Sequence, residues 1–216
     1  MKQLVIFDLD GTLLNTIADL GTAVNYALQK NKFPEHPISA YNMMVGNGVR
    51  RLIERAVPSE NRSDTTISNL LNDFYSYYDE HLFDNTKPYA GIESLLQELR
   101  SRDVSVAVAS NKYESAVKRL ITHFFSNIEF ASVCGNIEGY PRKPDPSVVF
   151  RILSEFPMIK EKVLYVGDSG VDVETARRAC VDSVAVSWGF RPMHELTSAN
   201  PNHIISMPAE LLSLLS

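Results

Sequence analysis

The chain has 216 residues, of which 44% are hydrophobic and 22% are charged, and its formal net charge is -5. This composition is ordinary for a globular protein with a full core, and its mildly acidic balance gives no electrostatic reason to expect nucleic acid as a partner. No stretch approaches the roughly 18 apolar residues of a membrane span, and the first apolar run is too short for a signal peptide. The two cysteines, Cys134 and Cys180, form no C-x-x-C pair. We therefore expect a cytoplasmic protein without a membrane partner.

Short apolar runs alternate with helical patterns along most of the chain. The runs begin directly after the N-terminus and are rich in β-branched residues; they cover residues 4–7, 104–109, 163–166, 184–186 and 203–205. Apolar residues at i, i+3, i+4 and i+7 predict helices between them, at 92–99, 117–124 and 149–156. This alternation predicts an α/β fold with a doubly wound, Rossmann-like parallel sheet.

One region interrupts the alternation. Residues 16–82 show helical periodicity and no convincing strand, with amphipathic patterns at 17–28, 49–56 and 70–78. Pro88 and Gly91 mark the return to the alternating pattern. We therefore expect an all-helical insertion, residues 15–84, within a catalytic core made of residues 1–14 and 85–216.

Two carboxylates follow the first predicted strand. Asp8 and Asp10 are two residues apart, so at strand spacing they point the same way from the carboxyl end of the strand, where open α/β sheets bind ligands. Gly11 permits a sharp turn directly after the pair. Alone, the pair also fits a simple turn. A hard cation such as Mg²⁺ would offset the repulsion between the two carboxylates.

Three other strand ends and loops carry polar residues that suit a phosphate and a metal. The run at 163–166 ends in Gly167 and Asp168, and Asp172 follows at the start of a predicted helix. The run at 104–109 ends in Ser110 and Asn111, whose hydroxyl and backbone amides suit phosphate oxygens, although Ser and Asn are also common helix caps. Lys143 lies in a loop with two prolines that restrict the backbone.

Together these segments resemble the four motifs of the haloacid dehalogenase superfamily, in the order that the superfamily has them. The motifs are Asp-Leu-Asp-Gly-Thr at 8–12, Ser110, Lys143, and Gly-Asp-Ser at 167–169 with Asp172. The helical insertion resembles the superfamily's cap domain. Within the superfamily the chain is similar to the phosphoglycolate phosphatases, through residues 45–49, 143–146 and 188–190. Asn15 departs from the pattern, since an acidic residue is common at that position.

The resemblance implies a Mg²⁺-dependent phosphatase that acts on a small phosphorylated metabolite. Asp8 would attack phosphorus and form an aspartyl-phosphate, while Asp10 would protonate the leaving group and later deprotonate water. The side chains of Asp8 and Asp168 and the backbone carbonyl of Asp10 would bind Mg²⁺. Asp172 would orient metal-bound water or Lys143.

The remaining implied roles concern recognition of the substrate. Ser110, Asn111 and Lys143 would bind the phosphoryl group. In the insertion, Gly46 would let the backbone approach the substrate closely, and Arg50 or Arg51, at the start of a helix, would pair with a substrate carboxylate; 2-phosphoglycolate is the best guess for the substrate. Adjacent arginines on an amphipathic helix are also commonly just solvated.

Several other functions share part of this pattern. A dehalogenase is disfavoured because a halide leaving group needs no proton, yet Asp10 is present. A phosphonatase would need a lysine in the cap, but Lys30 and Lys32 fit a solvated helix end better. A phosphomutase, a pyrophosphatase or a nucleotidase of the same superfamily remains open, as does a catalytically silent binding or regulatory module. The sequence leaves the oligomeric state open.

Overall fold

The computed structural model describes residues 1–216, and the chain divides into two compact units. One comprises Met1–Asn15 and Pro88–Ser216, and the other comprises Thr16–Lys87. The chain passes between the units twice, and the short strands β2 (Leu14–Asn15) and β3 (Lys87–Pro88) pair with each other at these crossings. None of the helices combines the length and the apolar character that a membrane crossing requires.

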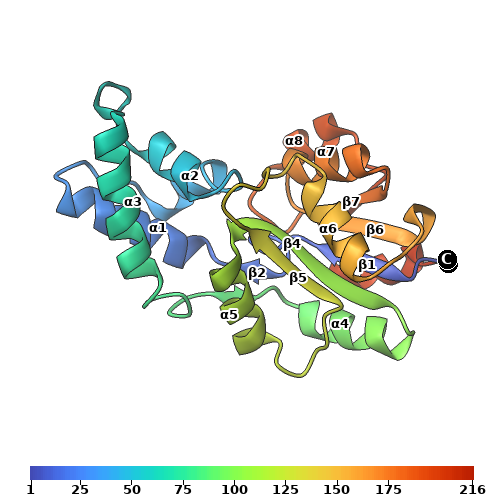
Figure 1. The fold of residues 1–216 in the computed structure, drawn as a ribbon. Helices are drawn as coiled ribbons and strands as arrows, with labels where there is room; N and C mark the ends of the chain where they lie inside the picture. Colours follow the sequence, from blue (N-terminus) through green and yellow to red (C-terminus); the bar gives the residue numbers. More distant parts are fainter. The chain divides into compact units, whose positions relative to one another are not determined.

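The larger unit is built on a six-stranded parallel sheet with the order β5-β4-β1-β6-β7-β8 (Figure 1). The strands are β1 (Leu4–Phe7), β4 (Ser105–Tyr113), β5 (Ser132–Asn136), β6 (Val163–Gly167), β7 (Asp182–Val186) and β8 (His203–Ile205). The four apolar residues of β1 are all buried, as a central parallel strand covered on both faces requires. The chain leaves β1 toward β4 and leaves β6 in the opposite direction toward β7. The carboxyl ends of β1 and β6 therefore form the switch point where such sheets bind ligands.

Helices cover both faces of this sheet (Figure 1). They are α4 (Ile92–Ser101), α5 (Glu114–Phe124), α6 (Ser147–Glu155), α7 (Gly170–Ala179) and α8 (Met193–Ala199), with 3₁₀ turns at Lys160–Lys162 and Pro208–Leu214. Helices α6 and α7 pack on the face that carries Leu4 and Ile6, through a buried cluster that includes Val149, Ile152 and Ala176. Right-handed crossovers place α4 and α5 on the other face.

The α/β fold class predicted from the sequence is confirmed, with two differences in detail. Strand β4 continues through Tyr113, beyond the apolar run that predicted it, and includes the polar residues Ser110, Asn111 and Lys112. Strand β5 was not predicted, because its sequence Ser-Val-Cys-Gly-Asn contains no continuous apolar run.

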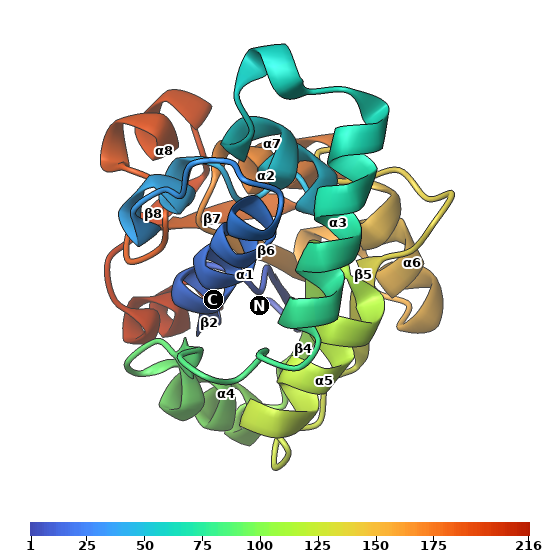
Figure 2. The ribbon, with the colours of Figure 1, turned by 90° about the vertical axis from the view of Figure 1, so that its left-hand side faces the viewer.

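The smaller unit is helical. It contains α1 (Ile17–Lys30), α2 (Val49–Ala56), α3 (Asp64–Tyr78) and 3₁₀ turns at Ile38–Met43 and Ser59–Asn61. Helices α1 and α3 lie side by side (Figure 2) and bury apolar residues such as Leu20, Val24 and Phe74. The buried Asp19 carboxylate accepts hydrogen bonds from the backbone amides of Asn85 and Thr86. This contact joins the start of the unit to its end.

Candidate active site

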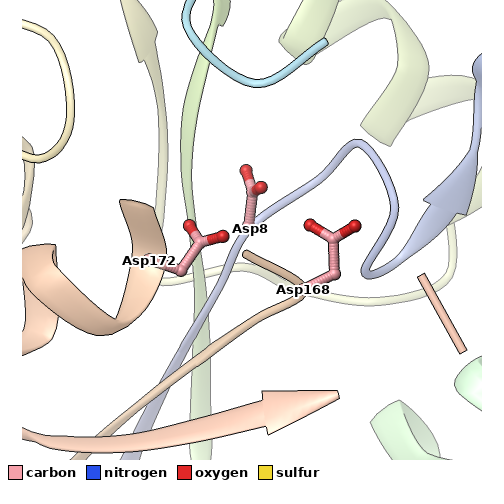
Figure 3. A group of neighbouring side chains, drawn as sticks. All are labelled: Asp8, Asp168 and Asp172. Atoms are coloured by element: carbon pink, nitrogen blue, oxygen red, sulfur yellow. The ribbon is translucent and has the colours of Figure 1, made fainter. Parts of the chain in front are cut away.

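Three carboxylates meet at the carboxyl ends of β1 and β6. Asp8 follows β1 directly, Asp168 follows β6, and Asp172 lies in the first turn of α7. One oxygen from each lies within 4.8 Å of the others, and the side chains converge from three separate elements (Figure 3). The strand order brings Asp8 and Asp168 together, since β1 and β6 are neighbours in register.

Lys143 is the cation of this cluster. Its Nζ lies 2.9 Å from Asp8 Oδ1 and 2.8 Å from Asp172 Oδ1, and it donates a 2.9 Å hydrogen bond to the carbonyl of Ala109. The side chain is only 3% exposed, so the ammonium group has exchanged water for these fixed partners. The ring of Tyr165 lies below it, with its centroid 5.7 Å from Nζ.

Burial and the charges of neighbouring groups shift the pKa values of this cluster. Burial raises the pKa of Asp8 to about 7, against the opposing effect of Lys143, and the charges of Asp172 and Asp10 raise it further. Burial, then Asp172 and Asp8, also raises the pKa of Asp168 well above its usual range. Burial alone would lower the pKa of Lys143, but Asp172 and Asp8 raise it, so this side chain stays an ammonium ion.

Asp172 is held from two directions. Its Oδ2 accepts hydrogen bonds of 2.5 Å from the Ser169 hydroxyl and 3.2 Å from the Ser169 amide, which with the reciprocal bond forms a capping box at the start of α7. Its Oδ1 contacts Lys143. Asp172 is thus both a helix-terminus residue and the anchor that fixes the Lys143 ammonium.

Asp168 lies in a cradle made by two glycines and a backbone amide. Gly11 has a φ of 88°, and a Cβ on it would collide with the Asp168 carboxylate. A Cβ on Gly189 would collide with Asp168 and with the Gly11 carbonyl oxygen. The amide of Phe190 donates a 2.6 Å hydrogen bond to Asp168 Oδ2, and the Trp188 indole donates to the Thr12 carbonyl. The loop after β7 therefore packs closely against the turn after β1.

The end of β4 lines the other side of the site. Ser110 and Asn111 are buried. The Asn111 side chain accepts a 2.8 Å hydrogen bond from the Lys143 amide and donates one of 3.1 Å to the Lys143 carbonyl, so it positions the lysine loop. Ser110 Oγ accepts a hydrogen bond from the Lys112 amide.

Asp10 is outside the group of three carboxylates and contacts a different lysine. Lys112 Nζ lies 3.0 and 3.1 Å from the two Asp10 carboxylate oxygens. No role was predicted for Lys112, although it lies only two residues after Ser110. The loop at 188–190, also without a predicted site role, was recognised only as a subfamily feature.

Arg50 and Arg51 belong to surface ion pairs within the smaller unit. Arg50 contacts Glu54 at 3.0 Å and Asp64 at 2.6 Å, and Arg51 contacts Glu54 at 2.6 Å. Gly46 has a φ of 115° and lies in the loop before α2. The Arg50 and Arg51 side chains are 43% and 67% exposed, so these pairs contribute little to stability.

The donor set fits a hard divalent cation. It consists of carboxylates with no sulfur or imidazole among them, and oxygen ligands of this kind suit Mg²⁺ better than Zn²⁺. Burial, and after it repulsion from neighbouring carboxylates, raises the pKa values of Asp8 and Asp168. A cation would remove that repulsion.

Comparisons with known proteins identify the family of the chain. The family model described as "Haloacid dehalogenase-like hydrolase" matches residues 5–186. A phosphoglycolate phosphatase of Mesorhizobium japonicum is 30% identical over 207 residues, which are 95% of this chain and 91% of that protein. A phosphoglycolate phosphatase of Haemophilus influenzae is 29% identical, with coverage of 99% and 98%.

Solved structures with the same fold include phosphoglycolate phosphatase-like proteins. A protein of Lactobacillus delbrueckii subsp. bulgaricus superposes with a TM-score of 0.93 and 30% identity, covering 100% of this chain and 99% of the other. A structure from Haemophilus somnus, described as a predicted phosphoglycolate phosphatase, has a TM-score of 0.91 and 25% identity, with coverage of 100% and 98%.

The chain belongs to the haloacid dehalogenase-like hydrolases. Within that family it is a phosphoric monoester hydrolase, and the resemblance and enzyme class predicted from the sequence are confirmed.

Proposed function

We propose that the enzyme hydrolyses a small phosphorylated metabolite with Mg²⁺, through a phosphoryl group carried on Asp8. The observation that carries this proposal is the position of Lys143 between Asp8 and Asp172 at the switch point of the sheet. A carboxylate attacks a phosphate dianion only where nearby positive charge reduces their repulsion. A buried ammonium group 2.9 Å from the carboxylate meets that need.

In the first step an Asp8 oxygen forms a bond to phosphorus, and the bond from phosphorus to the ester oxygen breaks. The electron pair of that bond goes to the leaving oxygen, which takes a proton from the Asp10 carboxyl group. In the second step water attacks phosphorus and gives a proton to the Asp10 carboxylate. The bond between Asp8 and phosphorus then breaks, which releases inorganic phosphate.

Asp8, Asp168 and the Asp10 backbone carbonyl would hold Mg²⁺, with Asp172 in an outer position that orients Lys143. The chemistry that the ion supplies when bound is neutralisation of charge on the phosphoryl oxygens. Ser110 and Lys143 would hold phosphoryl oxygens. We further propose a cytoplasmic location, with which the two free cysteines are consistent.

For the substrate we propose 2-phosphoglycolate, on the strength of the relatives named above and of two arginines at the start of α2. A guanidinium group binds a carboxylate through a two-pronged contact. Arg50 and Arg51 are held only by exposed ion pairs, which a substrate carboxylate can replace at small cost.

The test compares kcat/KM for 2-phosphoglycolate with that for phosphates whose other end is neutral, in the wild type and in the variants Arg50→Ala and Arg51→Ala. Loss of a charged contact should cost roughly 1.5–3 kcal/mol with the anionic substrate and far less with the neutral ones. Arg62→Ala is the matched control, because Arg62 lies in the same unit and contacts the Val57 carbonyl. Equal losses with both classes, or no wild-type preference for 2-phosphoglycolate, would refute the substrate assignment and leave the phosphatase chemistry standing.

A further inference from the structure

The chain buries a second lysine beside the site, separate from Lys143. The Lys112 side chain is 3% exposed, and its Nζ contacts both carboxylate oxygens of Asp10, at 3.0 and 3.1 Å. A lysine buried this deeply needs a partner, because an unpaired ammonium group in a protein interior is costly. Contact with both oxygens also restricts rotation of the Asp10 carboxylate.

The two buried lysines contact different carboxylates of the site. Lys143 contacts Asp8 and Asp172, whereas Lys112 contacts Asp10, so each of the two carboxylates after β1 has its own ammonium partner. Lys112 lies in β4 where the pairing with β5 is irregular, and its amide donates a hydrogen bond of 3.2 Å to Ser110 Oγ. The end of β4 therefore places the Lys112 side chain beside Asp10.

We propose that Lys112 is a positioning residue that holds Asp10 for proton transfer to the leaving group. This inference rests on the proposed function. When the Asp10 carboxyl group gives its proton to the leaving oxygen, a carboxylate remains, and the Lys112 ammonium group stabilises that new charge. The same contact keeps the carboxylate in place until water returns a proton to it.

Lys112 acts through Asp10, so its effect must depend on how much the leaving group needs a proton. An alkoxide leaving group is a strong base and needs one, whereas para-nitrophenolate is stable without it. A lysine that merely supports the fold would affect both substrates alike.

The experiment measures kcat/KM of Lys112→Met for an alkyl phosphate and for para-nitrophenyl phosphate. General acid catalysis contributes about 100-fold or more, so loss of its positioning should lower the alkyl value about tenfold and the aryl value less than about threefold. Lys112→Arg keeps a cation and should recover part of the alkyl activity. Lys118→Met, at an exposed lysine that pairs with Glu114, is the matched control and should change neither value.

A second arm uses Asp10→Asn, alone and combined with Lys112→Met. If Lys112 acts through Asp10, the double variant is no slower with the alkyl phosphate than Asp10→Asn alone. Equal losses with both substrates, or a further loss in the double variant, overturn the assignment. Should Lys112→Met fail to fold by circular dichroism, Lys112→Arg and Lys112→Gln answer the same question. A wild type that hydrolyses neither substrate overturns the proposed function itself, whereas an active wild type with unselective variants overturns only the role of Lys112.

Discussion

At the residue scale, the site contains oppositely charged side chains that are almost fully buried. The exposed fractions of the Lys143 and Asp172 side chains are 3% and 2%. Removing charges from water is costly, and their attraction offsets that cost only with close geometry and further hydrogen bonds. Both conditions hold here, since the Ala109 carbonyl and the Ser169 hydroxyl complete the set of partners.

Removing the Lys143 ammonium group should therefore be damaging. In Lys143→Met, Asp8 and Asp172 lose their partner, and breaking a buried pair in this way costs about 3 kcal/mol or more of unfolding free energy. Urea unfolding in the presence of a chelator measures this loss without compensation by a metal. Lys118→Met, at a lysine whose side chain is 57% exposed, should change the free energy by less than about 0.5 kcal/mol. A Lys143→Met protein as stable as the wild type would show that the cluster does not need its cation.

The sequence was sufficient to predict most of this cluster, for a physical reason. Asp8, Ser110 and Asp168 each follow an apolar run, and the ends of parallel strands meet at one edge of a sheet. The contact between Lys112 and Asp10 was not predictable in the same way, because a lysine on a strand is usually solvated. Its burial depends on tertiary packing that no local pattern reports.

At the scale of elements, the backbone of one loop helps to hold an acidic side chain of the site. The loop after β7 places Gly189 against Asp168 and directs the Phe190 amide at its carboxylate. Sequence patterns predicted the strands before this loop but not its packing, since a close approach between backbones leaves no periodic signal. Strand β5 was missed for a related reason, because its position in the sheet depends on pairing with β4 and not on apolar content.

A methyl group at position 189 should disturb this packing. Gly189→Ala places a Cβ inside contact distance of Asp168 and of the Gly11 carbonyl oxygen, so the loop or the carboxylate must move. We expect a loss of about 1–3 kcal/mol in unfolding free energy and a sharp fall in turnover. Gly170→Ala is the control, because its Cβ would lie 3.7 Å from the nearest atoms, an ordinary contact. Chemical unfolding and phosphate release measure both, and an unaffected Gly189→Ala protein would contradict the described cradle.

At the scale of the whole molecule, the proposed function assigns the phosphoryl site to the sheet and the selection of substrate to the helical unit. The predicted insertion covered residues 15–84, and the structure has a compact helical unit at Thr16–Lys87. Helical periodicity allows such a unit to be predicted from a sequence, but it does not show which of its side chains contact a substrate. The roles of Gly46, Arg50 and Arg51 therefore stay predictions.

Binding of Mg²⁺ should be visible in the stability of the intact chain. A ligand that binds only the folded state raises its melting temperature by mass action. We expect Mg²⁺ to raise the Tm of the wild type and to have little effect on Asp168→Asn, while EDTA abolishes turnover and Ca²⁺ inhibits it. Thermal unfolding with and without Mg²⁺ measures the first effect independently of activity. Full activity after exhaustive chelation, or a requirement for zinc, would exclude the proposed metal.

The central claim is that Asp8 is the nucleophile, and steady-state phosphate release by Asp8→Asn tests it most directly. An amide is a poor nucleophile and a poor ligand for Mg²⁺, so this variant should fold like the wild type and show no measurable turnover of either 2-phosphoglycolate or para-nitrophenyl phosphate. Circular dichroism establishes that the variant is folded. Substantial phosphate release by a folded Asp8→Asn protein would contradict the mechanism.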